Sequence, residues 1–209
     1  RSITTSAPLI GRHMAANAGL AIVMLVEAGF ELEAIGQALE PEGIQAYLPG
    51  RTERVSGDRG PSVYVDFGHS PDAFFTTLQA VRTFTPGRVI MVFGADGDRD
   101  ATKRHEMARV ASEYSDILVI TDHHPRFEDA ASIRAALLQG ARLAEHQADL
   151  FEVSPPEQAI RRAVSLAREG DSILWAGPGH QDYRDIRGER TPYSARSEAR
   201  DALREAGWA

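Results

Sequence analysis

The spacing of apolar residues divides the chain into two parts. Between Met14 and Leu39 apolar side chains recur at helical spacing, and Gly29 interrupts the run, which predicts a pair of short helices. Prolines and glycines then punctuate the chain, and beyond them the periodicity changes. We therefore predict a boundary near Tyr47, with a helical segment over residues 1–47 and a separate domain over residues 48–209.

The second part alternates short β-branched runs with amphipathic stretches. The runs predict strands at Thr52–Ser56, Ser62–Asp66, Arg88–Phe93, Asp116–Thr121, Asp149–Val153 and Ser172–Ala176, the first of them a weak edge strand. Helices are predicted over Pro71–Thr83, Thr102–Ser112, Ala130–Leu143, Pro156–Arg168 and Ser194–Glu205. Runs such as VIMVF are apolar on both faces, which is typical of parallel strands covered by helices on both sides. The expected fold is α/β: a Rossmann-like, doubly wound, mostly parallel six-stranded sheet preceded by a short helical segment.

Composition narrows the class of protein. The 209 residues are 43% apolar and 25% charged, as in ordinary globular proteins, and the formal charge of −7 argues against a general nucleic-acid surface. With no cysteine, disulfides, thiolate metal sites and cysteine nucleophiles are excluded. The longest apolar run near the start, Ala15 to Val26, is too short to span a bilayer. We expect a cytoplasmic protein with neither a nucleic-acid nor a membrane partner.

Polar turns follow four of the predicted strands, at 66–72, 94–100, 122–126 and 177–183. Ligands of open α/β sheets bind at the carboxyl ends of the strands, so these turns are expected to form the site. Helix capping by Asp72, Asp100 or Asp129 explains any one turn equally well. It does not explain why each turn carries a histidine or an arginine.

General nucleotide- and metal-binding motifs do not identify the ligand. No G-x-G-x-x-G string follows the predicted strands, which disfavours a Rossmann oxidoreductase, and the chain has no Gly-Lys pair and therefore no P-loop. If the protein uses ATP, the loop that binds the triphosphate lies outside this chain. Histidines and carboxylates are present in the turns (His69, His123, His124, His180, Asp66, Asp96 and Asp98), but no metal-binding spacing such as H-E-x-x-H occurs, so we expect no dedicated metal site.

The turns resemble an ordered set of motifs found in Mur ligases of the MurE type. These are PGRTERV from Pro49, VDFGHSPDA from Val65, FGADGDRD from Phe93, TDHHPR from Thr121 and AGPGHQDY from Ala176. Upstream, the string LIGR from Leu9 and the residue Asn17 resemble the helix that ends the family's central domain. The resemblance covers almost the whole chain, and five motifs in the family's order make it specific.

The resemblance implies an ATP-dependent ligase of peptidoglycan synthesis. Such enzymes phosphorylate the glutamate carboxylate of UDP-N-acetylmuramoyl-L-alanyl-D-glutamate, and the amino group of a diamino acid then attacks the acyl phosphate. ATP and Mg2+ are the implied cofactors, and the catalysis rests on positioning and electrostatics. Residues 48–209 resemble the amino-acid-accepting C-terminal domain and residues 1–47 the tail of the central ATPase domain. Without the N-terminal and central domains as partners, this chain alone is expected to be inactive.

The resemblance also implies site residues. The expected ATP contacts are Asn17, Arg51, Asp66 and His69. The expected acceptor pocket consists of Arg99, His124, Arg126, Gly177 and Gln181. Guanidinium groups suit phosphates and carboxylates, and the family ties Arg126 to the side-chain carboxylate of diaminopimelate. No catalytic residue is expected within this chain, while Arg54 and Lys103 have no assigned role.

Departures from the family motifs concentrate in the acceptor pocket. His123 and His124 replace an acidic residue and an asparagine, Pro178 replaces a lysine, and Gln181 replaces a glutamate. Smaller departures are Met14 and Ala195, where the family usually has Asn and Asp. Diaminopimelate is favoured by Arg126, while lysine, ornithine or a different acceptor stay open. The alternatives are a Mur-type ligase that joins glutamate or a whole peptide, and a non-catalytic binding module of the same fold.

Overall fold

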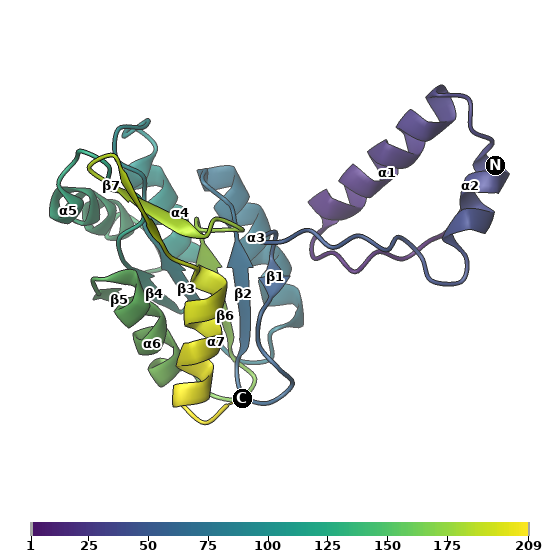
Figure 1. Cartoon of the computed structure of the whole chain (residues 1–209). Coiled ribbons are helices and arrows are strands. Elements are labelled where there is room, and N and C mark those ends of the chain that lie inside the picture. Colours follow the sequence, from purple (N-terminus) through teal and green to yellow (C-terminus); the bar gives the residue numbers. More distant parts are fainter. Residues whose placement is uncertain (1, 209) are drawn as a thin grey trace. The chain divides into compact units, whose positions relative to one another are not determined.

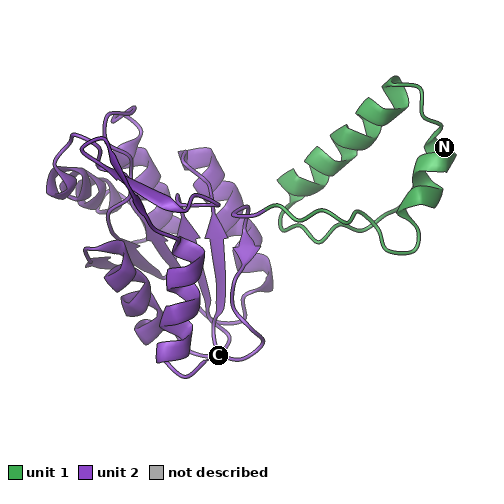
Figure 2. Ribbon diagram, in the orientation of Figure 1, with its two compact units in different colours: residues 1–48 green, residues 49–209 purple. Residues whose placement is uncertain are grey.

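The computed structural model describes residues 2–208 and consists of two compact units, which divide between Leu48 and Pro49 (Figure 2). Among the described residues, no helix has both the length and the apolar character needed to cross a bilayer.

The first unit is a helical pair, as expected from its periodicity. Helix α1 spans Arg12–Glu27 and helix α2 spans Leu32–Leu39. Gly29 lies between them with φ of 95°, a left-handed conformation that glycine adopts without steric penalty. No residue of α1 is buried within this unit, whereas Ile35 of α2 is.

The second unit is built on a six-stranded sheet in the order β1-β2-β6-β3-β4-β5 (Figure 1). Its strands are β1 (Glu53–Arg54), β2 (Ser62–Asp66), β3 (Val89–Phe93), β4 (Ile117–Ile120), β5 (Asp149–Glu152) and β6 (Ser172–Ala176). Its helices are α3 (Pro71–Phe84), α4 (Arg104–Tyr114), α5 (Ala130–Ala141), α6 (Pro156–Leu166) and α7 (Ala195–Glu205). Only β1 is antiparallel to its neighbour. The predicted α/β fold is confirmed.

Helices cover both faces of this sheet. Helices α6 and α7 pack on one face, where Val63, Ile90, Val119 and Trp175 form one core with them. Helices α3, α4 and α5 contact the other face (Figure 1). All five residues of β3 are buried, which is why this strand has no polar position.

One element was not predicted. A two-stranded hairpin, β7 (Tyr183–Ile186) paired with β8 (Glu189–Pro192), follows the last strand of the sheet. Its turn uses Arg187 and Gly188, both with positive φ (53° and 81°), as tight hairpin turns require. Strand β8 is exposed throughout, so it lacks the alternation of apolar and polar residues by which a half-buried strand is recognised.

Candidate functional site

The polar turns lie together because the sheet order makes their strands neighbours. In the parallel register, Asp66 at the end of β2 pairs with Ala176 at the end of β6, which pairs in turn with Phe93 at the end of β3. Phe93 pairs with Ile120 at the end of β4. Four strands therefore end at one level, and the turns that follow them share one edge of the sheet.

Glycines allow two of these turns to pack backbone against backbone. A Cβ atom on Gly97 would lie 1.9 Å from the carbonyl oxygen of Pro125, and one on Gly94 would lie 2.5 Å from that of Thr121. The Gly97 N–H donates to the carbonyl oxygen of His124 at 2.8 Å. The turn after β3 is thereby held against the turn after β4.

A buried arginine strengthens the same contact. Arg104, at the start of α4, donates from Nη2 to the carbonyl oxygen of Asp96 at 2.8 Å, and its Nη1 pairs with Glu128 Oε2 at 2.8 Å. Asp96 follows β3 and Glu128 follows β4, so one guanidinium joins both segments. This role for Arg104 was not foreseen from the sequence, where an isolated arginine in a helix predicts only a surface charge.

Asp66 organises the other side of the edge. Its Oδ2 accepts hydrogen bonds from the Thr52 amide at 2.9 Å and the Thr52 hydroxyl at 3.2 Å, and its Oδ1 accepts from the Gly68 amide at 2.7 Å. Both carboxylate oxygens therefore already have protein donors. Beside them, the exposed guanidinium of Arg51 lies over the Phe67 ring, 4.7 Å from its centroid, in a cation–π contact.

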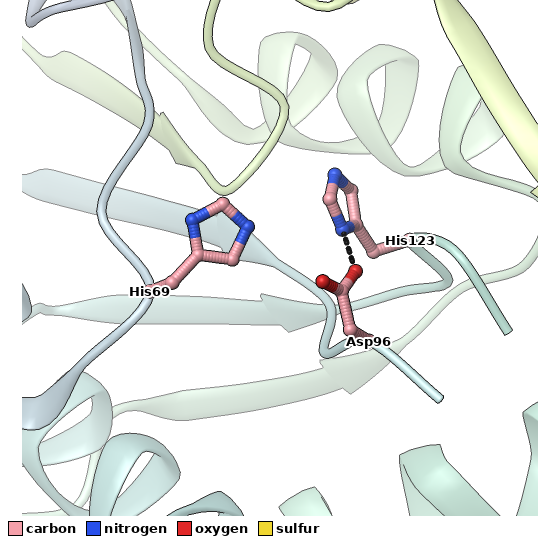
Figure 3. Close-up of side chains that lie close together, drawn as sticks. All are labelled: His69, Asp96 and His123. Atoms are coloured by element: carbon pink, nitrogen blue, oxygen red, sulfur yellow. Dashed lines mark hydrogen bonds and ion pairs between the residues drawn. The ribbon is translucent and has the colours of Figure 1, made fainter. Parts of the chain in front are cut away.

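His69, Asp96 and His123 come from three different turns and lie close together (Figure 3). Nδ1 of His123 is 2.7 Å from Oδ1 of Asp96, and Nδ1 of His69 is hydrogen-bonded to the carbonyl oxygen of Phe67. Figure 3 shows a ring nitrogen of His69 directed toward the Asp96–His123 pair. The His69 and His123 ring centroids are 5.5 Å apart.

Burial sets the charge states of this cluster. Removal from water lowers the pKa of His123 to about 4, although the hydrogen bond that His123 donates to Asp96 acts to raise this pKa. Burial also lowers the pKa of His69. For Asp96 burial is the largest influence and raises the pKa, but the hydrogen bond from His123 and the electrostatic influence of the three neighbouring histidines together outweigh it, and the pKa falls to about 2. At neutral pH the cluster is therefore two neutral imidazoles beside one carboxylate.

The lowered pKa of His123 predicts an acid-sensitive fold. Because the unfolded chain takes up a proton near the ordinary pKa of 6.5 and folded His123 only near 4, stability is fully present above pH 6.5 and is lost as the pH falls toward 4. We expect about 2 kcal/mol of unfolding free energy to be lost between about pH 7 and about pH 5, measured by urea denaturation. The variant His123→Gln should lose much of this dependence, leaving the smaller part that His69 contributes.

The exposed His180 provides the control, because His180→Gln should keep the full pH dependence. An equally steep loss in His123→Gln and in the unmodified chain would contradict the assignment of this effect to the buried imidazole.

His124 is fixed in one tautomer by two hydrogen bonds. Its Nδ1 accepts from the Asp185 amide at 3.0 Å, so in the neutral ring the proton is on Nε2, which donates to Gln181 Oε1 at 3.0 Å. The Tyr183 ring stacks on His124 with centroids 5.3 Å apart. The cavity beside these side chains has a volume of only about 10 Å³, so this corner of the site is closed in the structure.

Arg126 has an unusual backbone conformation. Its φ is 53°, its N–H donates to the carbonyl oxygen of Asp185 at 3.2 Å, and its own carbonyl oxygen accepts from Arg187 at 2.8 Å. The hairpin β7–β8 therefore holds it in a left-handed geometry that non-glycine residues seldom adopt. Its Nη2 lies 3.9 Å from Oδ2 of Asp96, and its buried Nε has no hydrogen-bond partner.

Comparison with known proteins identifies the family. Residues 50–179 match the family described as Mur ligase, glutamate ligase domain. The chain belongs to the Mur ligase family. The expectation drawn from the five motifs is thereby confirmed.

Relatives of this Mur ligase chain include longer proteins. It is 63% identical over 209 residues to a UDP-N-acetylmuramyl-tripeptide synthetase of Leifsonia xyli, covering 100% of this chain and 41% of that protein. It is 38% identical over 202 residues to a UDP-N-acetylmuramoyl-L-alanyl-D-glutamate--2,6-diaminopimelate ligase of Chelativorans, covering 95% and 39%. The chain thus spans about two-fifths of the length of these relatives.

A solved structure of a UDP-N-acetylmuramoyl-L-alanyl-D-glutamate--2,6-diaminopimelate ligase has the same arrangement. It aligns with a TM-score of 0.73 at 30% identity, over 98% of this chain and 41% of the other. A folylpolyglutamate synthase/dihydrofolate synthase from Yersinia pestis, complexed with AMPPNP and Mn ion, aligns over 86% of this chain and 40% of the other, with a TM-score of 0.64 and 26% identity.

Within this Mur ligase chain, the expected acceptor residues are only partly brought together. His124 and Gln181 are hydrogen-bonded, and Arg126 lies in the same turn as His124. Gly177 is buried, and a Cβ atom on it would be 3.8 Å from Nε2 of His123. Arg99 is exposed.

The expected ATP contacts divide between the units. Arg51, Asp66 and His69 belong to the second unit and flank Phe67, whereas Asn17 is exposed on α1 of the first. Asp96 and His123 were not placed in any expected ligand contact. The sequence showed both among the histidines and carboxylates of the turns, but without a metal-binding spacing, because their pairing depends on the fold.

Proposed function

We propose that this chain is the amino-acid-accepting part of an ATP-dependent ligase that adds a diamino acid to UDP-N-acetylmuramoyl-L-alanyl-D-glutamate in peptidoglycan synthesis. The observation that carries the proposal is the convergence of Arg126, His124 and Gln181 at one sheet edge in a chain 63% identical to a UDP-N-acetylmuramyl-tripeptide synthetase. We propose that the reaction takes place in the cytoplasm.

The role proposed for the acceptor residues follows from their chemistry. The planar guanidinium of Arg126 binds a carboxylate of the incoming amino acid in fork geometry, and exposed Arg99 offers a second such group. The carboxylate of Asp96, 3.9 Å from Arg126, attracts an ammonium group of the same molecule. Together they orient the amino group that attacks the acyl phosphate, which lowers the barrier by positioning.

Gln181 is poorly suited to bind a second ammonium group of the acceptor amino acid. Its Oε1 accepts a hydrogen bond from His124 Nε2–H, and as a neutral amide it does not attract a cation as a glutamate would. Diaminopimelate is supported by Arg126, because only an acceptor with a side-chain carboxylate needs a second cationic contact. Lysine and ornithine are the competing acceptors that an assay must include.

On the nucleotide side, we propose that Asn17, Arg51, Asp66 and His69 contact ATP. Arg51 is exposed and lies over Phe67, so its guanidinium can reach phosphate oxygens. Support comes from the aligned folylpolyglutamate synthase/dihydrofolate synthase, whose structure contains AMPPNP and Mn ion. The carboxylate of Asp66 is occupied by Thr52 and Gly68, so this residue is poorly suited to hold Mg2+. We therefore propose that Mg2+ binds with the ATP phosphates on residues outside 49–209, where it would neutralise their charge.

The proposal is tested by ATP-dependent phosphate release. The chain is joined to the N-terminal portion present in its relatives and assayed with UDP-N-acetylmuramoyl-L-alanyl-D-glutamate and either diaminopimelate, lysine or ornithine. Release that requires one diamino acid is expected, with a new amide product detected by mass spectrometry. Failure to release phosphate with any of the three, in a preparation that binds ATP, would favour a different acceptor or a binding module.

A further inference from the structure

The group formed by His69, Asp96 and His123 has a composition suited to a metal ion, a role that goes beyond the ligand contacts proposed above for His69 and Asp96. Two imidazoles and one carboxylate come from three separate turns, and one ligand atom from each lies within 4.8 Å of the others. Nitrogen and oxygen ligands of this kind suit divalent transition metals such as zinc. Among the residues that the structure describes, this is the one group of side chains with such an arrangement.

His69 is held in the orientation that metal binding needs. Nδ1 of His69 faces a carbonyl oxygen, which only accepts hydrogen bonds, so Nδ1 carries the proton and Nε2 keeps its lone pair. In metal sites, a bond of this kind from the second ring nitrogen to an oxygen fixes the tautomer and the ring direction. His123 offers Nδ1, which lies 2.7 Å from Asp96 Oδ1, so a bound ion takes the place of the proton that these two atoms share and releases it.

Neighbouring groups leave the cluster available. His124 stacks on His123 with ring centroids 4.1 Å apart, but both its nitrogens are already bonded, to Asp185 and Gln181. Arg126 approaches Oδ2 of Asp96 only to 3.9 Å, which is beyond hydrogen-bonding distance.

We propose that His69, Asp96 and His123 bind one divalent transition-metal ion, of which Zn2+ is the best match to the ligand set. Two ligands each ~2.1 Å from a tetrahedral ion lie roughly 3.4 Å apart, so ligand atoms spaced by up to 4.8 Å approach one another by at most about 1.4 Å when the ion binds. Rotation of the His69 and Asp96 side chains, which are only partly buried, supplies this movement. Three protein ligands leave at least one position for water or for an oxygen of a bound ligand.

The test uses the metal alone with the 209-residue chain. Zn2+ binding is measured by isothermal titration calorimetry, and Co2+ is added as a spectroscopic probe because its visible absorption reports coordination by nitrogen and oxygen ligands. We expect one ion per chain. The variants Asp96→Asn and His69→Gln each lose a direct ligand, so they should bind Zn2+ more weakly by at least the roughly 10- to 100-fold that loss of an outer partner costs.

Two controls separate this site from surface histidines and from misfolding. His180→Gln removes an exposed histidine from the same edge and should keep the affinity of the unmodified chain. Asp96→Asn preserves the shape of the side chain, so its far-ultraviolet circular dichroism should be unchanged. Equal Zn2+ affinity in the unmodified chain, Asp96→Asn and His69→Gln, or the absence of any stoichiometric binding, would overturn the proposal. Neither ATP nor an amino acid is present, so the outcome is independent of the proposed ligase function.

Discussion

Replacing Arg126 by alanine in the intact enzyme is expected to raise the KM for a carboxylate-bearing acceptor about 100-fold while leaving the KM for ATP nearly unchanged. The backbone of Arg126 is held by Asp185 and Arg187 of the hairpin, so its guanidinium is presented from a rigid position. Loss of a charge-assisted, two-pronged contact removes binding energy for that substrate alone. Steady-state kinetics with each substrate varied in turn measures the effect.

Two further variants sharpen this test. Arg126→Lys keeps the charge but not the fork geometry and should give an intermediate KM. Arg142→Ala removes the same charge from the end of α5, away from the sheet edge that bears Arg126, and should change neither constant. Equal increases in the KM values for ATP and for the acceptor in Arg126→Ala would refute the pocket assignment.

The substitution Gly97→Ala is expected to lower the free energy of unfolding by about 3 kcal/mol. The added Cβ would lie 1.9 Å from the carbonyl oxygen and 2.7 Å from the carbonyl carbon of Pro125, and backbone atoms cannot move aside as a flexible side chain can. The hydrogen bond from Gly97 to His124 ties the two turns at the same place. Equilibrium denaturation in guanidinium chloride measures the loss.

Gly57→Ala is the matched control, because this exposed glycine has nothing within 4 Å of an added Cβ. Its unfolding free energy should change by no more than about 0.5 kcal/mol. If Gly97→Ala were as stable as Gly57→Ala, the close packing of the turns after β3 and β4 would not be a feature of the folded protein.

The sequence by itself determined most of the sheet. A strand such as β3, buried on both faces, has to be apolar at every position, so the run VIMVF predicts this strand. The motif-bearing turns were expected at the carboxyl edge because parallel strands all end there. Where burial is weaker the prediction was poorer: β1 is only Glu53–Arg54, and the exposed hairpin β7–β8 was missed because solvent imposes no alternation.

Local signals were ambiguous at the helix ends. Asp129 caps α5 by accepting from the Ser132 amide, as its position suggested. Helix α3, in contrast, is capped by Ser70 and not by Asp72, since Pro71 occupies the first helical position. Serine and aspartate both favour the N-cap position, so two neighbouring residues of these types are distinguished only by the backbone path that the rest of the fold imposes.

Only the tertiary structure decided which side chains of the turns meet. Asp96 and His123 are far apart along the chain and have no motif spacing, yet they are hydrogen-bonded because β3 and β4 are adjacent and Gly97 lets their turns touch. His69 follows β2, which only β6 separates from β3 in the sheet, so its side chain lies close to the other two. Strand order arises from long-range packing that local periodicity does not encode, so the sequence identified the chemical groups and the edge they occupy, and the fold determined their contacts.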